Sequence, residues 1–188
     1  MSKSIKLVGV GGQGTILATK ILSTALIHEG YDVKMSEIHG MSQRGGSVSS
    51  EIRFGDKVHS PVIEKGHADV LVAFEQMEAA RYLDYIKKDG VVIVNDYQVN
   101  SMVTLTGKVP YPQGILSYLK DHVQTVIVDA HTMAGKLGNA KVMNIIMLGA
   151  LIKQLGFEHL DIEGAILEHV KPKYHELNKI AFQQGLQL

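Results

Sequence analysis

The chain has 188 residues, with 45% hydrophobic and 20% charged side chains, 19 basic against 19 acidic residues, and no cysteine. This hydrophobic content excludes a disordered tail, and the length is typical of one domain that buries roughly 70% of its unfolded surface. The absence of cysteine excludes disulfides, a thiol nucleophile, a zinc finger and a cysteine-ligated iron–sulfur cluster. Because the net charge is zero, there is no broad basic field, and we expect no nucleic-acid partner.

The apolar segments are too short to direct the chain into a membrane. The first apolar run, residues 5–10, is shorter than a signal-peptide core and leads directly into glycines. The longest apolar stretch, residues 142–152, is far below the ~20 residues that a membrane-spanning helix needs. We therefore expect a cytoplasmic protein without a membrane partner.

The first part of the chain alternates between strand and helix patterns. Residues 5–8 form a short β-type run, the turn GVGGQG follows at 9–14, and apolar residues then recur at helical spacing as far as Gly30. Residues 31–38 have the pattern of a second strand, and residues 39–46 that of a polar, glycine-rich loop. Strand, glycine turn, helix and strand in this order predict a parallel α/β sheet.

The rest of the chain adds strands, hairpins and a helical end. The predicted strands are 47–54, 69–74, 90–95 and 124–129, the predicted helices are 75–87, 114–122, 142–155, 161–169 and 172–183, and small hairpins are expected at 47–59 and 103–109. No repeat or linker interrupts the pattern. We predict one domain over residues 1–188, with a Rossmann-like, parallel-dominated sheet, flanking helices, small hairpins and a helical C-terminal third.

The glycine turn is the first candidate binding site. Its candidate residues are Gly9, Gly11, Gly12, Gln13 and Gly14. In a dinucleotide-binding fold such glycines allow a tight turn, a close approach of phosphate to the backbone and close packing of helix on strand. Glu37 lies 23 residues beyond Gly14, where that fold places the acid that binds a ribose. The turn therefore favours either an NAD- or FAD-binding oxidoreductase domain or an assembly module in which the glycines serve packing alone.

The segment SEIHGMSQRGGSV at residues 36–48 is the second candidate site. It concentrates polar side chains and glycines in a loop that follows a strand, where parallel sheets place their ligands. Its candidate residues are Ser42, Gln43, Arg44, Gly45 and Gly46. Arg44 offers a rigid guanidinium fork for a phosphate or a carboxylate. The alternative is a solvated loop with one surface arginine.

Three further polar residues lie at the predicted carboxyl ends of strands. Asn95, Asp129 and His131 are therefore second-tier candidates, because ligands bind at this edge of a parallel sheet. His169 and His175 are six residues apart and do not share one helical face, so we expect no metal site. No residue stands out as catalytic.

The two loops together resemble a known family. GVGGQG at 9–14 with SEIHGMSQRGGSV at 36–48 is similar to the gamma-type domain of the 2-oxoacid:ferredoxin oxidoreductases, the pyruvate/ketoisovalerate catalytic domain family, and most similar to its indolepyruvate branch. Further matching segments are residues 80–83, 93–95, 111–112, 138–141, Asn144 and 148–150. The resemblance spans nearly the whole chain.

The resemblance implies a function in a complex. Such enzymes convert a 2-oxoacid, here an aryl pyruvate such as indolepyruvate, with coenzyme A and oxidised ferredoxin into acyl-CoA, carbon dioxide and reduced ferredoxin, using thiamine diphosphate. This chain has neither a GDG-type diphosphate and metal motif nor a cysteine. We therefore expect a small subunit, inactive alone, whose large partner carries thiamine diphosphate, Mg²⁺ and the iron–sulfur clusters and through which the complex meets ferredoxin. The two loops would face coenzyme A or the partner's active site, and no cofactor would be bound tightly by this chain.

Overall fold

The computed structural model describes residues 2–39 and 45–188, and its centre is a six-stranded sheet. The strand order is β2-β3-β1-β4-β5-β6. The strands are β1 (Lys3–Val10), β2 (Asp32–His39), β3 (Ser47–Gly55), β4 (Ala68–Ala73), β5 (Ile86–Asn95) and β6 (Gln124–Val128). Strand β3 runs antiparallel to β1 and β2, while β1, β4, β5 and β6 pair in parallel. The prediction of a parallel-dominated α/β sheet is confirmed.

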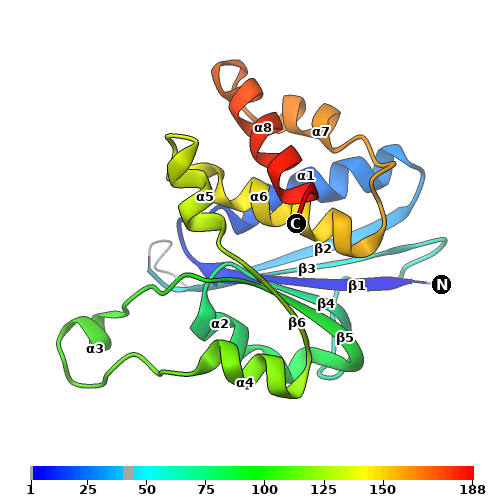
Figure 1. Cartoon of the computed structure of the whole chain (residues 1–188). Coiled ribbons are helices and arrows are strands. Elements are labelled where there is room, and N and C mark those ends of the chain that lie inside the picture. Colours follow the sequence, from blue (N-terminus) through cyan, green and yellow to red (C-terminus); the bar gives the residue numbers. More distant parts are fainter. Residues whose placement is uncertain (1, 40–44) are drawn as a thin grey trace.

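Helices cover both faces of this sheet (Figure 1). The upper layer in that view consists of α1 (Thr15–His28), α5 (Ala130–Lys136), α6 (Met143–Leu155), α7 (Ile162–His169) and α8 (His175–Leu186). The lower layer consists of α2 (Gln76–Arg81) and α4 (Ile115–His122). The short helix α3 (Met102–Leu105) stands away from both layers, and 3₁₀ turns form at Leu83–Tyr85, Ala140–Val142 and Pro172–Tyr174.

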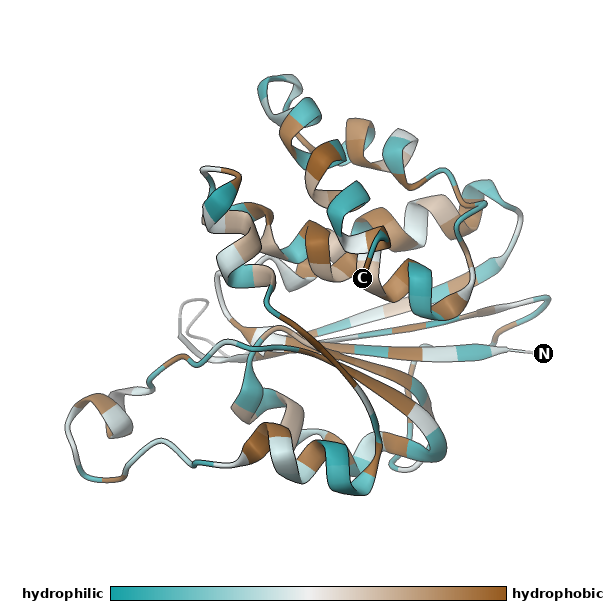
Figure 2. Cartoon of the chain, in the orientation of Figure 1, coloured by the Kyte–Doolittle hydropathy of each residue, from teal (hydrophilic) through white to brown (hydrophobic). Residues whose placement is uncertain are grey.

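The main core lies between the sheet and the upper layer. Alternate side chains of β1, such as Ile5 and Leu7, point into it, whereas Val8 points into the lower layer. Helix α6 is buried from Met143 to Ile152, as its apolar sequence predicts. Hydrophobic residues accordingly run along the central strands and through the upper helices in Figure 2.

Two of the predicted elements in the middle of the chain are wrong. The helix predicted at 75–87 ends at Arg81, and β5 begins already at Ile86, because Ile86 pairs with Ala68 of β4 before a register irregularity and residues 91–94 pair with β4 after it. The hairpin predicted at 103–109 is instead the helical turn α3, which begins after Ser101. Thr104 donates hydrogen bonds from its backbone N–H to the Ser101 hydroxyl, at 3.3 Å, and from its own hydroxyl to the Ser101 carbonyl, at 2.8 Å.

The hairpin predicted at 47–59 is also wrong. Strand β3 pairs with β1 on one side and with β2 on the other, so neither of its edges is free for residues 58–59. The N–H of Val58 donates instead to the Asp32 carboxylate, at 2.9 Å. Helix α5 was not predicted; Asp129 begins it by accepting a hydrogen bond from the N–H of Thr132 at 3.3 Å.

Candidate functional site

The candidate residues gather at the edge of the sheet where the parallel strands end. The glycine turn follows β1, Glu75 comes shortly after β4, and Asn95 ends β5. Because β3 is antiparallel, its first residue, Ser47, lies at this same edge, opposite Val10. We call this the carboxyl edge; it lies on the left in Figure 1.

The glycine turn is held by hydrogen bonds within the protein. The carboxamide of Gln13 accepts from the N–H of Val10 at 2.7 Å and donates to the carbonyl of Phe74 at 3.1 Å, which ties the end of β1 to the end of β4. The N–H of Gly11 donates to the carbonyl of Gly46 at 2.8 Å, and that of Gln13 to the carbonyl of Val10 at 3.1 Å. Two amides that a phosphate cradle would use are therefore engaged internally.

Packing explains two of the glycines. A Cβ at position 9 would lie 2.8 Å from the Gln13 side-chain oxygen and 3.1 Å from Cβ of Phe74. Gly14 has a φ of +81°, and a Cβ there would lie 2.5 Å from the side-chain nitrogen of Asn144, which donates to the Gly14 carbonyl. Position 14 therefore favours glycine through its backbone conformation whether or not a ligand binds, and a side chain at position 9 would crowd the Gln13 carboxamide that ties β1 to β4.

A cavity of about 590 Å³ opens beside the turn. It is lined by Gly11, Gly12, Gly14, Thr15, Ile16, Leu17, Lys20, Val48 and His169. The 14-residue helix α1 begins at this cavity, so the positive end of the helix dipole and the Lys20 ammonium both favour an anion there. His169 comes from α7, and its Nε2 lies 2.7 Å from the Thr24 hydroxyl. The cavity fits a ligand that carries phosphate on a larger, partly apolar body.

Glu37 lies away from this cavity. Its register partner in β3 is Ser50, whose partner in β1 is Leu7. Glu37 therefore lies two strands away from β1, opposite the middle of β1 rather than its carboxyl end. Two strand spacings amount to about 10 Å. One carboxylate oxygen of Glu37 is buried without a hydrogen-bond partner among residues 2–39 and 45–188, and so is the Ser50 hydroxyl. The insertion of β3 thus separates Glu37 from the position of a ribose-binding acid beside the first strand.

The second loop is described only in part. Ser42, Gln43 and Arg44 lie outside the described residues. Gly45 and Gly46 lie against the glycine turn, where the N–H of Gly45 donates to the Gly11 carbonyl at 3.4 Å. The two predicted loops are therefore neighbours in space.

The second-tier candidates make contacts within the protein. The fully buried Asn95 donates from Nδ2 to the Phe74 carbonyl at 3.2 Å and accepts from the N–H of Ala130 at 3.0 Å, which links β4 and α5 to the end of β5. Asp129 caps α5. The His131 ring stacks on Tyr97 with a centroid separation of 4.0 Å. The geometry brings all three to the carboxyl edge without placing them at the cavity.

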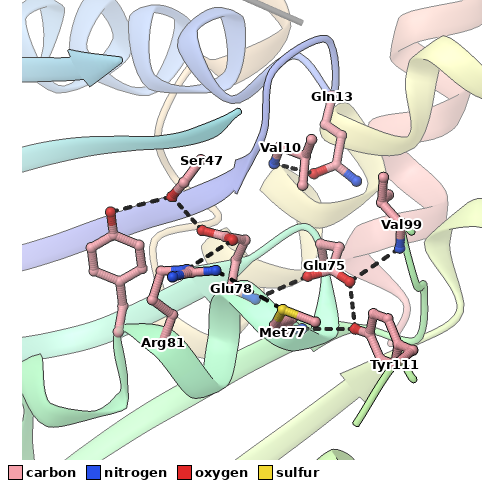
Figure 3. A network of polar contacts seen from close by, with 10 residues as sticks. Val10, Gln13, Ser47, Glu75, Met77, Glu78, Arg81, Val99 and Tyr111 are labelled. Carbon is pink, nitrogen blue, oxygen red and sulfur yellow. Dashed lines mark hydrogen bonds and ion pairs between the residues drawn. The ribbon is translucent and has the colours of Figure 1, made fainter. Parts of the chain in front are cut away.

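A buried polar network lies beneath the two loops (Figure 3). Glu75, 1% exposed, accepts from the Tyr111 hydroxyl at 2.5 Å, from the N–H of Val99 at 3.1 Å and from the N–H of Glu78 at 2.9 Å. Burial, followed by the hydrogen bond to the Glu75 carboxylate, raises the pKa of Tyr111. The network therefore keeps the phenol as a hydrogen-bond donor.

Glu78 extends this network to the second loop. Its carboxylate accepts from the Ser47 hydroxyl at 2.5 Å and from Nε of Arg81 at 3.1 Å. A small cavity of about 90 Å³ lies among these groups, with Val10, Gly45 and Ser101 also in its lining. The first strand, the second loop and the segment after β5 meet around it.

Comparison with known proteins identifies the family. The family described as pyruvate ferredoxin/flavodoxin oxidoreductase matches residues 4–188. The chain belongs to this family. It is 37% identical over 193 residues to indolepyruvate oxidoreductase subunit IorB of Pyrococcus horikoshii, covering 97% of this chain and 94% of that protein. It is 31% identical over 191 residues to 2-oxoglutarate synthase subunit KorC of Methanocaldococcus jannaschii, covering 100% and 94%.

A solved structure agrees with this membership of the pyruvate ferredoxin/flavodoxin oxidoreductase family. The gamma subunit of keto/oxoacid ferredoxin oxidoreductase from Geobacter sulfurreducens PCA superposes with a TM-score of 0.74 at 28% identity, covering 100% of this chain and 95% of that one. The family resemblance read from the two loops is confirmed. The relatives are subunits of oxidoreductase complexes, which agrees with the small-subunit prediction and not with a stand-alone dinucleotide-binding domain.

Sequence reasoning missed several residues of this oxidoreductase subunit's carboxyl edge. Lys20 and His169 line the large cavity but carry no motif, and His169 is brought there by a helix late in the chain. Glu75 could have been found, because it directly follows the predicted strand 69–74 and so falls under the rule that selected Asn95, whereas Glu78 lies inside the helix that follows.

Neither a metal cluster nor a membrane helix is found within the described ranges. Across residues 2–39 and 45–188, no three His, Asp or Glu side chains gather closely enough to hold a metal ion. In the same part of the chain, no helix has the length and apolar character needed to cross a membrane.

Proposed function

We propose that this chain, as one gamma-type domain over residues 1–188, is the small subunit of a cytoplasmic arylpyruvate:ferredoxin oxidoreductase. The carrying observation is the 37% identity to an indolepyruvate oxidoreductase subunit over 97% of the chain, against 31% to a 2-oxoglutarate synthase subunit. The reaction is the oxidative decarboxylation of an aryl 2-oxoacid with coenzyme A, with electrons passed to ferredoxin. Since the chain has no cysteine, the iron–sulfur clusters belong on a large partner subunit, with thiamine diphosphate and Mg²⁺.

The role of the chain within the complex is to present the two loops to the partner's active site. The 590 Å³ cavity offers the start of α1, the Gly12 and Gly14 backbone and the Lys20 ammonium to the phosphates of coenzyme A. Arg44, which lies outside the described residues, is the second cation that the sequence offers for this contact. Because the amides of Gly11 and Gln13 donate to carbonyls within the protein, we assign the contact with the phosphates to the backbone at the start of α1. When bound, coenzyme A supplies the thiol that accepts the acyl group.

Reconstitution of the two-subunit enzyme tests the proposal. The chain and its large, cysteine-rich subunit are purified separately, mixed, and assayed for ferredoxin reduction with indolepyruvate, phenylpyruvate, pyruvate and 2-oxoglutarate. We expect activity from the mixture alone, with the highest kcat/KM for the two aryl pyruvates. Activity of the isolated chain, or its tight binding of NAD(H) or FAD in calorimetry, would contradict the proposal, and a preference for 2-oxoglutarate would contradict the substrate assignment.

Two substitutions test the coenzyme A contact in the reconstituted enzyme. Lys20→Ala and Arg44→Ala each remove one cation, and we expect the KM for coenzyme A to rise about tenfold in each, since a charge-assisted hydrogen bond contributes about 1.5–3 kcal/mol. Lys88→Ala is the matched control, because Lys88 is an exposed lysine in the first half of β5, away from the carboxyl edge. If the Lys20 and Arg44 variants both keep the control's KM, this chain does not hold coenzyme A.

A further inference from the structure

The connection between β5 and α4 is a long excursion from the carboxyl edge. It comprises residues 96–114, which we call the arm, and the helical turn α3 is its regular element. Figure 1 shows the arm leaving the sheet and extending beyond both helix layers. Connections of more than about 12–15 residues are uncommon in compact domains and are usually functional when ordered.

Both ends of the arm are tied to the body through one buried carboxylate. Glu75 accepts from the N–H of Val99 near the start of the arm and from the hydroxyl of Tyr111 near its end. The Tyr111 hydroxyl also accepts from the N–H of Met77, at 2.9 Å, and the carbonyl of Tyr97 accepts from the N–H of Gln76, at 3.0 Å. The arm is therefore fixed at its base on the amino end of α2, as Figure 3 shows for Val99, Glu75 and Tyr111.

The outer part of the arm exposes apolar side chains. Val103, Leu105 and Val109 are 50%, 65% and 52% exposed, and Lys108 is the single charged residue between positions 97 and 114. Isolated exposed hydrophobic residues are ordinary on protein surfaces. Three within seven residues, on a nearly uncharged segment that projects from a fixed base, have the composition of the buried centre of a protein interface.

The base of the arm belongs to the same surface as the two loops. Val99 and Ser101 of the arm line the 90 Å³ cavity together with Val10, Gly45 and Ser47. A partner that covers the loops therefore lies next to the base of the arm. The proposed function assigns that face to the large subunit, which must complete the active site there.

We propose that the arm docks the chain onto the large subunit of its own enzyme by placing Val103, Leu105 and Val109 in an apolar groove of that subunit. This inference rests on the proposed function, because it takes the thiamine-diphosphate-binding subunit as the partner. The groove must be apolar and carry little charge, since the outer part of the arm offers burial and one lysine rather than a charge pattern.

Charge insertion at the arm tests the inference in the two-subunit enzyme. Leu105→Asp should weaken the dissociation constant for the large subunit, measured by calorimetry, by at least about tenfold, since a buried interface contact becomes a desolvated charge. Thr106→Asp is the matched control, because it adds the same charge at the neighbouring exposed position and should change the constant by less than about threefold. The Tm of each isolated variant should equal the wild-type value, since both side chains face solvent.

Further readouts separate the possible failures. Leu105→Ala, which adds no charge, should weaken binding by a smaller factor in the same direction, and it replaces the aspartate variant if that variant loses its fold. Equal affinities of wild type, Leu105→Asp and Leu105→Ala would overturn the inference while leaving the proposed function intact. A wild-type chain that does not bind the large subunit would instead contradict the proposed function.

Self-association is the remaining alternative. Sedimentation of the isolated chain distinguishes it: we expect a monomer for wild type and for Leu105→Asp. A wild-type dimer that Leu105→Asp dissociates would assign the arm to a second copy of this chain and overturn the inference.

Discussion

The two faces of the sheet bury different chemistry. On the upper face, ten consecutive residues of α6 are buried, and its backbone touches that of α8, where a Cβ at Gly185 would lie 2.2 Å from the Ile146 carbonyl oxygen. On the lower face, the buried side chains include Lys6, Glu51, Glu75 and Glu78. The upper layer is thus held by apolar contact and the lower layer also by charged hydrogen bonds.

The lower face shows this most clearly at Lys6. Its side chain is 2% exposed, and its ammonium lies 2.6 Å from the carboxylate of Glu51, its direct neighbour on β3, and 4.1 Å from the centre of the Tyr85 ring. The second oxygen of Glu51 accepts from the N–H of Ile63 at 3.3 Å. Each charge of the pair therefore has a further favourable partner, which offsets the cost of removing both charges from water.

The contrast indicates a division of roles. Apolar burial is non-directional and provides most of the folding free energy, whereas buried hydrogen bonds and ion pairs fix particular atoms relative to one another. In this protein the buried charged residues that make such contacts lie on the face that carries α2, which supports the second loop and the arm.

The largest effect is expected from breaking the buried ion pair. Lys6→Met leaves the Glu51 carboxylate buried without its counter-charge, so the free energy of unfolding in urea should fall by about 3–5 kcal/mol. The double variant Lys6→Met/Glu51→Leu should recover most of this loss. A single variant as stable as wild type would show that the lower face does not depend on its charges.

A smaller loss is expected from crowding the apolar layer. Gly185→Ala forces α6 and α8 apart and should cost about 1–3 kcal/mol in the same urea experiment. Gly135→Ala in α5 is the control, because no atom lies within 4 Å of the added Cβ, and its stability should be unchanged or slightly higher. Equal stabilities of the two variants would show that the helix contact tolerates an extra methyl group.

The smallest effect is expected from an exposed pair on the lower face. The hydrogen bond from Lys34, followed by that from the N–H of Val58, holds the pKa of Asp32 below its ordinary value of 3.8. A lowered pKa stabilises the folded state above pH 3.8, and this stabilisation is lost as the pH falls through the folded-state pKa. Asp32→Asn should therefore be slightly less stable than wild type at pH 7, and the difference should shrink in denaturation curves measured below pH 3.8. A difference that grows towards acid pH would have the wrong sign for this pair.

Much of the fold could be predicted because its signals are local. Short continuous apolar runs identified the buried strands 69–74 and 90–95, helical spacing identified α1, and a longer apolar run identified α6, since these patterns depend on neighbours within a few residues. The elements that were wrong depend on distant partners. Strand β5 begins at Ile86 because this residue pairs with Ala68 of β4, and the helical turn α3 forms where the hairpin at 103–109 was predicted.

The candidate site likewise contains residues that local sequence patterns could identify and residues that depend on distant partners. Gly9, Gly14 and Gln13 could be selected from sequence because a strand followed directly by a glycine-rich turn has few backbone solutions. The structure adds a reason without a ligand: Gly14 has a positive φ, and a side chain at position 9 would crowd Gln13. Lys20 and His169 could not be selected together, since nothing in a sequence indicates that α7 lies against α1. The arm, expected as a hairpin, became a candidate docking element only when its fixed base and exposed tip were seen.

The sequence by itself determined the fold class, the two loops and the membership of an oxidoreductase family, because these depend on composition and on short motifs. It also determined that this chain supplies no cysteine ligand. The tertiary structure alone decided which strands are neighbours. By placing β3 between β1 and β2, it separated Glu37 from the glycine turn and brought Ser47 to the carboxyl edge above Glu78. Strand pairing joins residues far apart in the chain, and the free energies that choose between pairings are summed over the whole core rather than carried by any one motif.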